Sequence, residues 1–305
     1  MVNQAKVIAR AGSRPKTQVL TSDKLTPLSW LLHGFSTRRG GVSRAYGGNA
    51  LNLGFTKHDS RAAVERNRKI FLKDLGAGAI NGRHPWPLVA SRQIHSDLIH
   101  RIEATSDGGV PQPLVGDGLV TDTPGILLAV QMADCLPVIV ADRTQHAVGI
   151  FHAGWRGTVQ RIVEKGVGEM RKEFGSDPRD LVAAIGPGIR QCCYAVGDEV
   201  RTRFEAQFAY SASLFREVKD SDPVREKYPL LFLTARGPGH SELPVKIFLD
   251  MAEANRRQLL DAGVLARNIG TTAPCTACHP ELLFSHRAEK GVTGRMMGAV
   301  GINPK

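Results

Sequence analysis

Apolar residues form dense runs in the middle of the chain, and these runs predict buried strands. Three of them follow one another between residues 125 and 153, with the sequences GILLAVQMAD, CLPVIVAD and HAVGIFHA. They are short and rich in Val, Ile and Leu, which favours buried strands over helices. The run LVAAIGPGI, which begins at Leu181, and the segment 88–96 are predicted to be further strands.

Other segments repeat their apolar residues at the spacing of a helix. The apolar positions of residues 158–174 fall on one helical face, which predicts an amphipathic helix. Ser60 and Gly76 are a typical cap and stop for a second helix between them. Two more helices are predicted over 196–208 and 248–264. Because strands and helices do not alternate strictly, the pattern predicts a layered α/β or α+β fold.

The N-terminal segment lacks the patterning of the rest of the chain. Residues 1–26 are polar and basic, and we expect a loose arm there. Residues 27–305 are predicted to form a single layered α/β domain. Within this domain, residues 211–245 are irregular and rich in proline, which predicts a long loop or an insertion.

Composition narrows the class of protein. With 305 residues, 42% of them hydrophobic, the chain can bury a large core. A net charge of +11 favours anionic partners, but Lys and Arg are spread along the chain, so we expect no specific nucleic-acid partner. Five cysteines in so large a chain favour a reducing compartment. No segment resembles a membrane span or a signal peptide, and we expect a cytoplasmic protein without a membrane partner.

The apolar segment from residue 132 to residue 157 also carries reactive side chains. A symmetric hairpin turn centred between Arg143 and Thr144, with a loop of about two or four residues, would place Cys135 directly across from His152. Such a pair can ligate a metal ion or act as a thiol–imidazole pair. It can equally be a small buried cysteine that packs beside a hydrogen-bonded core histidine.

Two neighbouring residues favour the metal interpretation. His95, at the end of the strand predicted over 88–96, would complete a set of three ligands with Cys135 and His152. Three nitrogen or sulfur ligands with one open position are typical of catalytic zinc, and Cu²⁺ suits the same donors. Asp134 is a candidate general acid or base, although a hydrogen-bonded carboxylate at a strand end shows the same pattern.

Glycines and arginines supply candidate phosphate-binding residues. Gly154 and Arg156 lie in HAGWRG, between a strand and the start of a helix, where backbone N–H groups and a guanidinium favour anions. Arg39, followed by Gly40 and Gly41, offers a second such arrangement, unless Arg39 is a solvated surface charge.

Other candidates have weaker signals. Gln93 opens the motif QIHS and is a candidate substrate-binding residue. His33 begins a predicted strand and is either a substrate-binding residue or a hydrogen-bonded core imidazole. The motif CTACH at 275–279 matches a haem-attachment pattern and could also form a second zinc site through Cys275, Cys278 and His279. The interpretation favoured over both is a structural loop near the pocket. The pair Cys192 and Cys193 is expected to pack in the core or a pocket wall.

The order of the motifs resembles the YfiH-type laccase-domain family. HGFSTRRGGVS, NLG, QIHS, DGLVTD, MADCLPV, FHAGWRGT, IGPGI, CCYAVG, LFSHR and TGRM occur in this order from about residue 31 onward. The resemblance implies a single α/β sandwich domain, distantly similar to cysteine-dependent deamidating toxins. It also implies a metal triad at His95, Cys135 and His152, the set reached above from spacing. Gly188 and Ala195 stand where many members have Cys and Glu, but neither belongs to the triad.

The resemblance also implies an activity. Members are described as zinc- or copper-associated enzymes that catalyse phosphorolysis of adenosine, inosine and methylthioadenosine, as well as adenosine deamination, and they carry an older polyphenol oxidase label. We therefore expect a purine nucleoside phosphorylase with Zn²⁺ or Cu²⁺ as cofactor and inorganic phosphate as co-substrate. Cys135, Asp134 and Arg156 are the expected catalytic residues.

Other functions stay open at this point. A cysteine hydrolase or amidase would use Cys135 as nucleophile and His152 as base, for example to edit a cell-wall precursor. A multicopper oxidase would need many histidines, usually in His-x-His pairs, and the chain has ten histidines and no such pair. A nucleic-acid-binding module is supported by the net charge alone.

Overall fold

The structure, a computed structural model, describes residues 18–78, 84–104, 114–219, 245–271 and 274–304. The chain divides into two compact units. The first unit comprises Met1–Arg190 and Met251–Lys305, and the second comprises Gln191–Asp250. Each unit is treated by itself below.

The first unit contains a five-stranded sheet whose central strand comes from the end of the described chain. Its order is β1 (Val19–Leu20), β2 (Leu31–Ser36), β15 (Met296–Ile302), β7 (Leu127–Met132) and β4 (Leu88–Ala90). β15 runs antiparallel to both β2 and β7, and only the β4–β7 pair of this sheet is parallel. A short strand, β3 (Arg39–Ser43), follows β2.

The same unit contains a six-stranded sheet. Its order is β14 (Ile269–Thr271), β10 (Leu181–Ile185), β8 (Leu136–Asp142), β9 (Val148–Ala153), β6 (Gly118–Thr121) and β5 (Ile99–Arg101). β8 and β9 form the predicted hairpin at its centre. Both sheets mix parallel and antiparallel pairs, which confirms the predicted α+β class.

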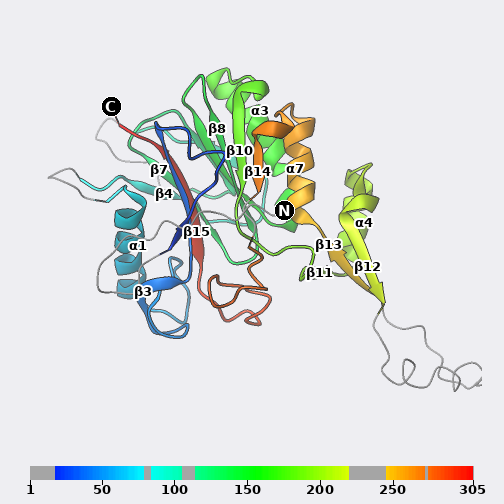
Figure 1. Ribbon diagram of the computed structural model, residues 1–305, viewed down its shortest axis with the longest axis horizontal. Coiled ribbons are helices and arrows are strands. Elements are labelled where there is room, and N and C mark those ends of the chain that lie inside the picture. The colour runs from blue at the N-terminus through cyan, green and yellow to red at the C-terminus, as the bar shows by residue number, and fades with distance from the viewer. Residues whose placement is uncertain (1–17, 79–83, 105–113, 220–244, 272–273, 305) are drawn as a thin grey trace, which may run out of the picture. The chain divides into compact units, whose positions relative to one another are not determined.

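The two sheets stack face to face and bury one core between them (Figure 1). Leu128 and Val130 of β7 belong to this core together with Ile139 of β8 and Ile150 of β9. The alternate residues of β7, such as Leu127, point to the opposite face. Because both faces of the central strands are covered, these strands appear in the sequence as continuous apolar runs.

Helices cover the outer face of each sheet. α1 (Arg61–Leu75) packs on the five-stranded sheet through Phe71 and Leu75. α3 (Ile162–Phe174) and α7 (Met251–Asp261) cover the six-stranded sheet. Gly166 of α3 is essential to this packing, because a Cβ there would lie 2.3 Å from the Phe151 ring. The arrangement is the predicted sandwich, with helices outside two stacked sheets.

The helix predictions are confirmed, with one interruption. Ser60 caps α1 by accepting a hydrogen bond from the Ala63 N–H, and Gly76 ends it with a left-handed φ of 102°. The helix predicted over 158–174 is split into α2 (Trp155–Val159) and α3. Arg161 separates them with a φ of 62°, a conformation that a continuous α-helix does not allow. Short 3₁₀ turns complete this unit at Pro178–Asp180 and Ala266–Asn268.

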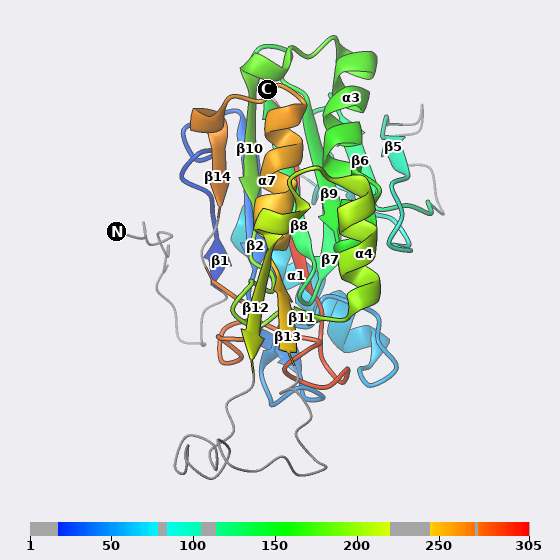
Figure 2. The same cartoon turned by 90° about the vertical axis from the view of Figure 1, so that its right-hand side faces the viewer.

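The described part of the second unit contains a three-stranded sheet and an α-helix. Figure 2 shows the strands in the order β11 (Ala195–Val196), β13 (Val245–Leu249) and β12 (Phe215–Lys219). α4 (Asp198–Gln207) packs on the sheet, with the Phe204 and Phe215 rings 5.9 Å apart. A 3₁₀ turn, Ser211–Leu214, precedes β12. The prediction of an irregular segment over 211–245 is therefore wrong for these two elements, and residues 220–244 lie outside the described residues.

The N-terminal arm is shorter than the sequence predicts. β1 lies within residues 1–26, yet it pairs with β2 through Val19 and Leu20. Leu25 is completely buried, so residues 18–26 belong to the folded unit. Their short apolar stretch, VL followed by a turn, is too brief to show a period in the sequence. The remainder of the predicted arm lies outside the described residues.

No helix in the described ranges combines the length and the apolar character needed to cross a bilayer.

Candidate active site

The structure brings the three predicted metal ligands together. A ring nitrogen of His95, the sulfur of Cys135 and a ring nitrogen of His152 all lie within 4.8 Å of one another. The Cys135 Sγ is 3.9 Å from the His95 Nε2, and the two imidazole rings are 5.0 Å apart at their centroids. His152 is buried, Cys135 is half-buried and His95 is exposed, so the group opens to solvent on the His95 side.

The β8–β9 hairpin brings Cys135 close to His152, but its register differs from the predicted one. His152 lies opposite Pro137 rather than Cys135, and Asp142 closes the loop by donating its N–H to the Ala147 carbonyl. The predicted direct pairing of Cys135 with His152 is therefore wrong by two positions. Because side chains on a strand alternate between faces, a shift of two keeps both residues on the same face. Cys135 precedes β8 and meets His152 diagonally.

Asp117, directly before β6, connects two of the three ligands. It is completely buried, and its Oδ1 accepts a hydrogen bond from the His152 Nδ1 at 2.8 Å. The same carboxylate accepts bonds from the backbone N–H groups of Ile94, His95 and Ser96 and from the Ser96 hydroxyl. Asp117 thereby holds the loop that carries His95 and fixes the proton of His152 on Nδ1, which leaves Nε2 for a metal ion.

The loop that carries His95 is held in a strained shape. His95 has a φ of 60°, in the left-handed region that non-glycine residues rarely adopt. The three backbone bonds to Asp117 stabilise this conformation. Gln93 anchors the beginning of the loop, because its side-chain amide donates to the Gln131 carbonyl and accepts from the Gln131 N–H. Gln93 therefore has a structural role next to the site, and its predicted substrate contact stays a prediction.

Asp134 holds the turn before Cys135. It too has a left-handed φ, of 93°. Its carboxylate accepts hydrogen bonds from the Thr276 and Ser285 hydroxyls, at 2.6 and 2.7 Å, and from the Arg287 N–H at 2.6 Å. These three donors occupy both carboxylate oxygens. The contacts describe a residue that positions Cys135, and its predicted acid–base role stays a prediction.

Gly154 leaves room for the ligands. A Cβ at this position would lie 2.9 Å from the Cys135 Sγ and 3.0 Å from the His95 Cδ2. No other residue type fits there without displacing a ligand. The neighbouring Arg156 is exposed on α2, with its guanidinium 4.3 Å from the centre of the Trp155 ring, and phosphate binding by Arg156 stays a prediction.

The charges of Cys135 and His152 are coupled. Burial alone would raise the pKa of the Cys135 thiol, but the neighbouring His152 and His95 rings lower it to about 6. Burial alone would lower the pKa of His152, but Cys135 and Asp117 raise it to about 9. Burial alone would also raise the pKa of Asp117, yet its donors, His152 first, hold that pKa well below its usual range. Both shifts favour the thiolate of Cys135 and the imidazolium of His152.

This donor set fits a zinc or copper ion. A tetrahedral Zn²⁺ with usual bond lengths places a sulfur and a nitrogen ligand about 3.6 Å apart, close to the 3.9 Å between Cys135 and His95. The lowered pKa of Cys135 supplies the thiolate that such an ion requires. Three ligands and an open side match a catalytic rather than a structural metal site.

Two other predicted substrate-binding sites have structural contacts of their own. His33 on β2 is buried, and its Nε2 accepts a hydrogen bond from the Ser22 N–H at 3.0 Å, which matches the core-imidazole interpretation. Burial lowers the pKa of His33 to about 4.

The Arg39 side chain donates to the Glu281 carbonyl, and a Cβ on Gly41 would lie 2.2 Å from the Ala50 carbonyl oxygen. Gly40 has a φ of 90°, which favours glycine. These contacts give Arg39, Gly40 and Gly41 structural roles, and phosphate binding by them stays a prediction.

Sequence reasoning missed Asp117 as a functional residue. Its only signal is its place at the head of DGLVTD, directly before a buried strand. One aspartate before a strand has many structural explanations, and its partners lie 21 to 35 residues away in the chain.

A hollow of about 300 Å³ opens beside Gln131, whose backbone is bonded to Gln93. Phe55, Lys57 and Arg295 are among its lining residues. Phe55 is 51% exposed, and the Arg68 guanidinium lies 4.4 Å from the centre of its ring. The hollow therefore combines an accessible aromatic ring with cationic groups. Nothing in the sequence pointed to these residues as a set.

Comparisons with known proteins identify the family of this chain. A family model described as multi-copper polyphenol oxidoreductase laccase matches residues 32–303. The chain belongs to this family. The match spans nearly all of the first unit and the whole of the second, and it confirms the resemblance inferred from the motifs.

Relatives within this laccase family carry a different enzyme name. Purine nucleoside phosphorylase YlmD of Bacillus subtilis (strain 168) is 31% identical over 277 residues, covering 89% of this chain and 88% of that protein. A purine nucleoside phosphorylase of Deinococcus radiodurans is 35% identical over 272 residues, covering 88% of each chain. The crystal structure of the Bacillus licheniformis protein YfiH has a TM-score of 0.76 at 30% identity, covering 95% of this chain and 98% of that one. The α+β fold is therefore shared, while the predicted likeness to deamidating toxins stays a prediction.

Proposed function

We propose that this chain is a metal-dependent purine nucleoside phosphorylase that cleaves adenosine, inosine and methylthioadenosine with inorganic phosphate. The observation that carries the proposal is the open three-ligand group of His95, Cys135 and His152. Relatives that span the same length are named purine nucleoside phosphorylases, which supports the reaction class. In this proposal the resident ion is Zn²⁺, and Cu²⁺ would suit the same ligands.

Phosphorolysis forms one bond, breaks another and needs a proton for the leaving purine. A phosphate oxygen forms a bond to the anomeric carbon, the glycosidic C–N bond breaks, and the purine leaves with the electron pair and takes up a proton. A bound metal ion would polarise substrate or orient phosphate at its open position. Arg156 and Arg39 are the proposed phosphate-binding residues, with the backbone of Gly40, Gly41 and Gly154 nearby in the chain.

The hollow beside Gln131 is the proposed place of the nucleoside. Its exposed Phe55 ring can stack on a purine, and Lys57 and Arg295 can bind anionic oxygens. Gln131 is bonded to Gln93, two residues before the ligand His95, so the hollow and the metal ligands share one support. His33 has no part in this proposal, because its ring is buried and its Nε2 is already bonded.

Adenosine deamination is a second proposed activity of the same site. Water would add to the amino-bearing carbon of the purine, ammonia would leave, and inosine would remain. A single open metal position can serve this reaction and phosphorolysis, since both place an oxygen nucleophile next to a bound nucleoside.

The test measures base release from the three nucleosides with and without phosphate, together with metal content. Wild type should release base only with phosphate, and Cys135→Ser should lose both base release and metal. His279→Asn is the matched control, because His279 is exposed and outside the three-ligand group. A wild type without metal, or unchanged base release by Cys135→Ser, would overturn the proposal.

A cysteine hydrolase or amidase is the second candidate, and one observation favours it. Cys135, His152 and Asp117 form a thiol–imidazole–carboxylate chain, in which Asp117 orients His152 and the pKa of Cys135 is lowered. This function predicts that the chelator-treated protein keeps its activity and that an amide substrate or an alkylating reagent becomes attached to Cys135. Loss of all activity on chelation would exclude it.

A multicopper oxidase does not fit the donor set, despite the description of the family model. Among the described residues, only His95 and His152 contribute histidine nitrogens to a group of three or more candidate ligands. A trinuclear copper cluster needs several times that number of imidazoles.

A further inference from the structure

The hollow described above contains two cationic side chains that have no carboxylate partner. Lys57 is exposed and Arg295 is half-buried, and none of the described residues that line the hollow with them is acidic. Asp59 and Glu289 lie within two positions of a lining residue, but Asp59 is engaged in hydrogen bonds and Glu289 in an ion pair with Arg38. Among the described residues, neither Lys57 nor Arg295 has an ion-pair partner. The hollow therefore carries a positive charge that favours an anion.

Arg295 is fixed at one end of its guanidinium. Its backbone N–H donates to the Asn52 side chain at 2.8 Å, and its Nη1 donates to the Thr293 and Gly294 carbonyls at 3.0 and 3.1 Å. The Nε and Nη2 form no hydrogen bond with a described residue. Gly54 makes room for this side chain, because a Cβ there would lie 2.6 Å from the Arg295 Cγ. Two neighbouring N–H groups on a fixed guanidinium match two oxygens of one phosphate.

Neutral groups in the same hollow suit a nucleic base. The Phe55 ring is 51% exposed, and aromatic rings of this kind stack on bases. The Gln131 side-chain amide forms no hydrogen bond with a described residue, and an amide can donate and accept along the edge of a base. A Cβ on Gly54 would also lie 2.6 Å from the Gln131 Oε1, so the amide and Arg295 pack against the same glycine. Groups that bind a base therefore lie next to groups that bind an anion.

The loop that ends at Arg295 is attached to the support of Cys135. Near its beginning, the Ser285 hydroxyl and the Arg287 N–H donate to the Asp134 carboxylate at 2.7 and 2.6 Å. Asp134 holds the strained turn directly before Cys135. The hollow is thus connected to the candidate metal ligands through this loop as well as through the bonds between Gln93 and the neighbouring strand.

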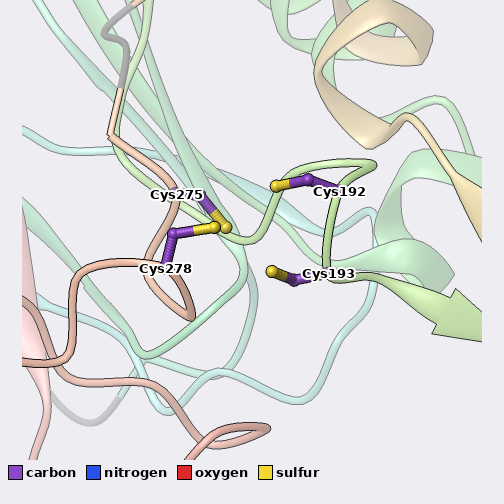
Figure 3. A group of neighbouring side chains, drawn as sticks. All are labelled: Cys192, Cys193, Cys275 and Cys278. Atoms are coloured by element: carbon purple, nitrogen blue, oxygen red, sulfur yellow. The ribbon is translucent and has the colours of Figure 1, made fainter.

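The CTAC turn supports the same carboxylate. Figure 3 shows the sulfurs of Cys275 and Cys278 side by side in this turn, and the hydroxyl of the intervening Thr276 donates to the aspartate at 2.6 Å. His279 does not converge with these two sulfurs, and its Nδ1 is bonded to Glu281 at 3.3 Å. These contacts match a structural loop near the pocket, the interpretation that the sequence favoured for CTACH.

We propose that the hollow binds a purine nucleoside 5′-monophosphate, with its phosphate on Arg295 and Lys57 and its base on Phe55 and Gln131. A nucleoside would leave both cations without an anion, and inorganic phosphate would leave the ring and the amide unused. A phosphate ester carries a charge of about −2 and uses both sets of groups. The inference deepens the proposed function, because methylthioadenosine also has a substituent at the 5′ position. The choice of a purine rests on that function, whereas the phosphate contact does not.

The experiment measures equilibrium binding to the full-length protein by calorimetry in phosphate-free buffer. Adenosine 5′-monophosphate should bind about 10–100-fold more tightly than adenosine, which is the usual effect of hydrogen bonds to a charged group. Arg295→Gln should remove most of this advantage, and Lys57→Gln should lower it about 3-fold, because Lys57 is exposed. Both variants should bind adenosine as wild type does. Arg143→Gln, an exposed arginine outside the hollow, is the matched control and should change neither affinity.

Gln131→Leu provides a second readout, because it should weaken adenosine and its 5′-monophosphate by the same factor. If Arg295→Gln fails to fold, the exposed Lys57 still tests the phosphate contact. The proposal is wrong if the nucleotide binds no more tightly than adenosine, or if Lys57→Gln and Arg295→Gln weaken both ligands equally. Inorganic phosphate that binds as tightly as the nucleotide would also overturn it. Nucleotide binding without base release from any nucleoside would contradict the proposed function and leave this inference standing.

Discussion

Asp117 and Asp134 are both buried aspartates that hold a strained turn beside a proposed metal ligand, but they contact different groups. Asp117 touches His152 directly through the Nδ1 and bonds three successive N–H groups around His95. Asp134 bonds two hydroxyls and the N–H of Arg287, and acts on Cys135 through the backbone. Asp117 therefore acts on His152 through its charge and also fixes the position of the His95 loop. Asp134 only fixes the position of the turn before Cys135.

The two sets of partners differ in whether they could still form hydrogen bonds if the aspartate were replaced by asparagine. Hydroxyl groups of Thr276 and Ser285 can rotate to donate or to accept, so they tolerate an amide in place of the carboxylate. Backbone N–H groups can only donate. Both oxygens of Asp117 face backbone donors, so the region around Asp117 requires a carboxylate and the region around Asp134 does not.

The largest expected effect is that of Asp117→Asn. In either orientation its NH₂ group would face a backbone N–H, so the His95 loop and the His152 proton would both lose their support. Changes of this kind typically reduce metal affinity or activity by about 10–100-fold. Zinc affinity by chelator competition and kcat/KM would measure the loss. Ser96→Ala, which removes one hydroxyl donor, should change both values far less.

Gly154→Ala tests placement without any change of charge. The added Cβ would push the Cys135 sulfur or the His95 ring by several tenths of an ångström. A displacement of about 1 Å can cost about 100-fold in rate, so we expect a loss of about 10-fold in kcat/KM and in zinc affinity. Gly168→Ala on α3 is the matched control, because a Cβ there meets nothing within 4 Å. Equal effects of the two substitutions would contradict the tight fit at Gly154.

The smallest effect should come from Asp134→Asn. Its Oδ1 can still accept the Arg287 N–H, while its NH₂ group donates to the two hydroxyls after they rotate. We expect unfolding free energy to fall by about 1 kcal/mol, with kcat/KM changed only a few-fold. Chemical denaturation and steady-state kinetics would measure these changes. A loss of activity as large as that of Asp117→Asn would remove the distinction between the two regions.

The parts of the molecule that the sequence predicted well depend on local pattern. The apolar runs predicted β7, β8, β9 and β10, and Ser60 with Gly76 predicted both ends of α1. These features follow from residues close together in the chain. The meeting of Cys135 and His152 was also predicted, because the two residues lie directly before β8 and on β9 of one hairpin.

The parts that were missed depend on distant contacts. The predicted hairpin register was wrong by two because β8 continues to Asp142, whose carboxylate caps the following turn by accepting from the Thr144 and Gln145 N–H groups. Cys135 and His152 still meet, because a register shift of two residues keeps both side chains on the same face of the sheet. Asp117 has partners far away in sequence, and the Arg190–Cys275 bond joins two turns that are 85 residues apart. A single sequence shows no signal that links such residues.

The position of β15 has a consequence for how the protein is made. β15 lies between β2 and β7, and the Met297 N–H bonds the Ser36 hydroxyl across 261 residues of chain. A ribosome that adds about 5–20 residues per second needs about 10–30 s to pass from Met132 to Met296. During that time β2 and β7 have no neighbour on their facing edges. The five-stranded sheet can close only after nearly all of the chain has been synthesised, so its two exposed edges are where a chaperone would be needed.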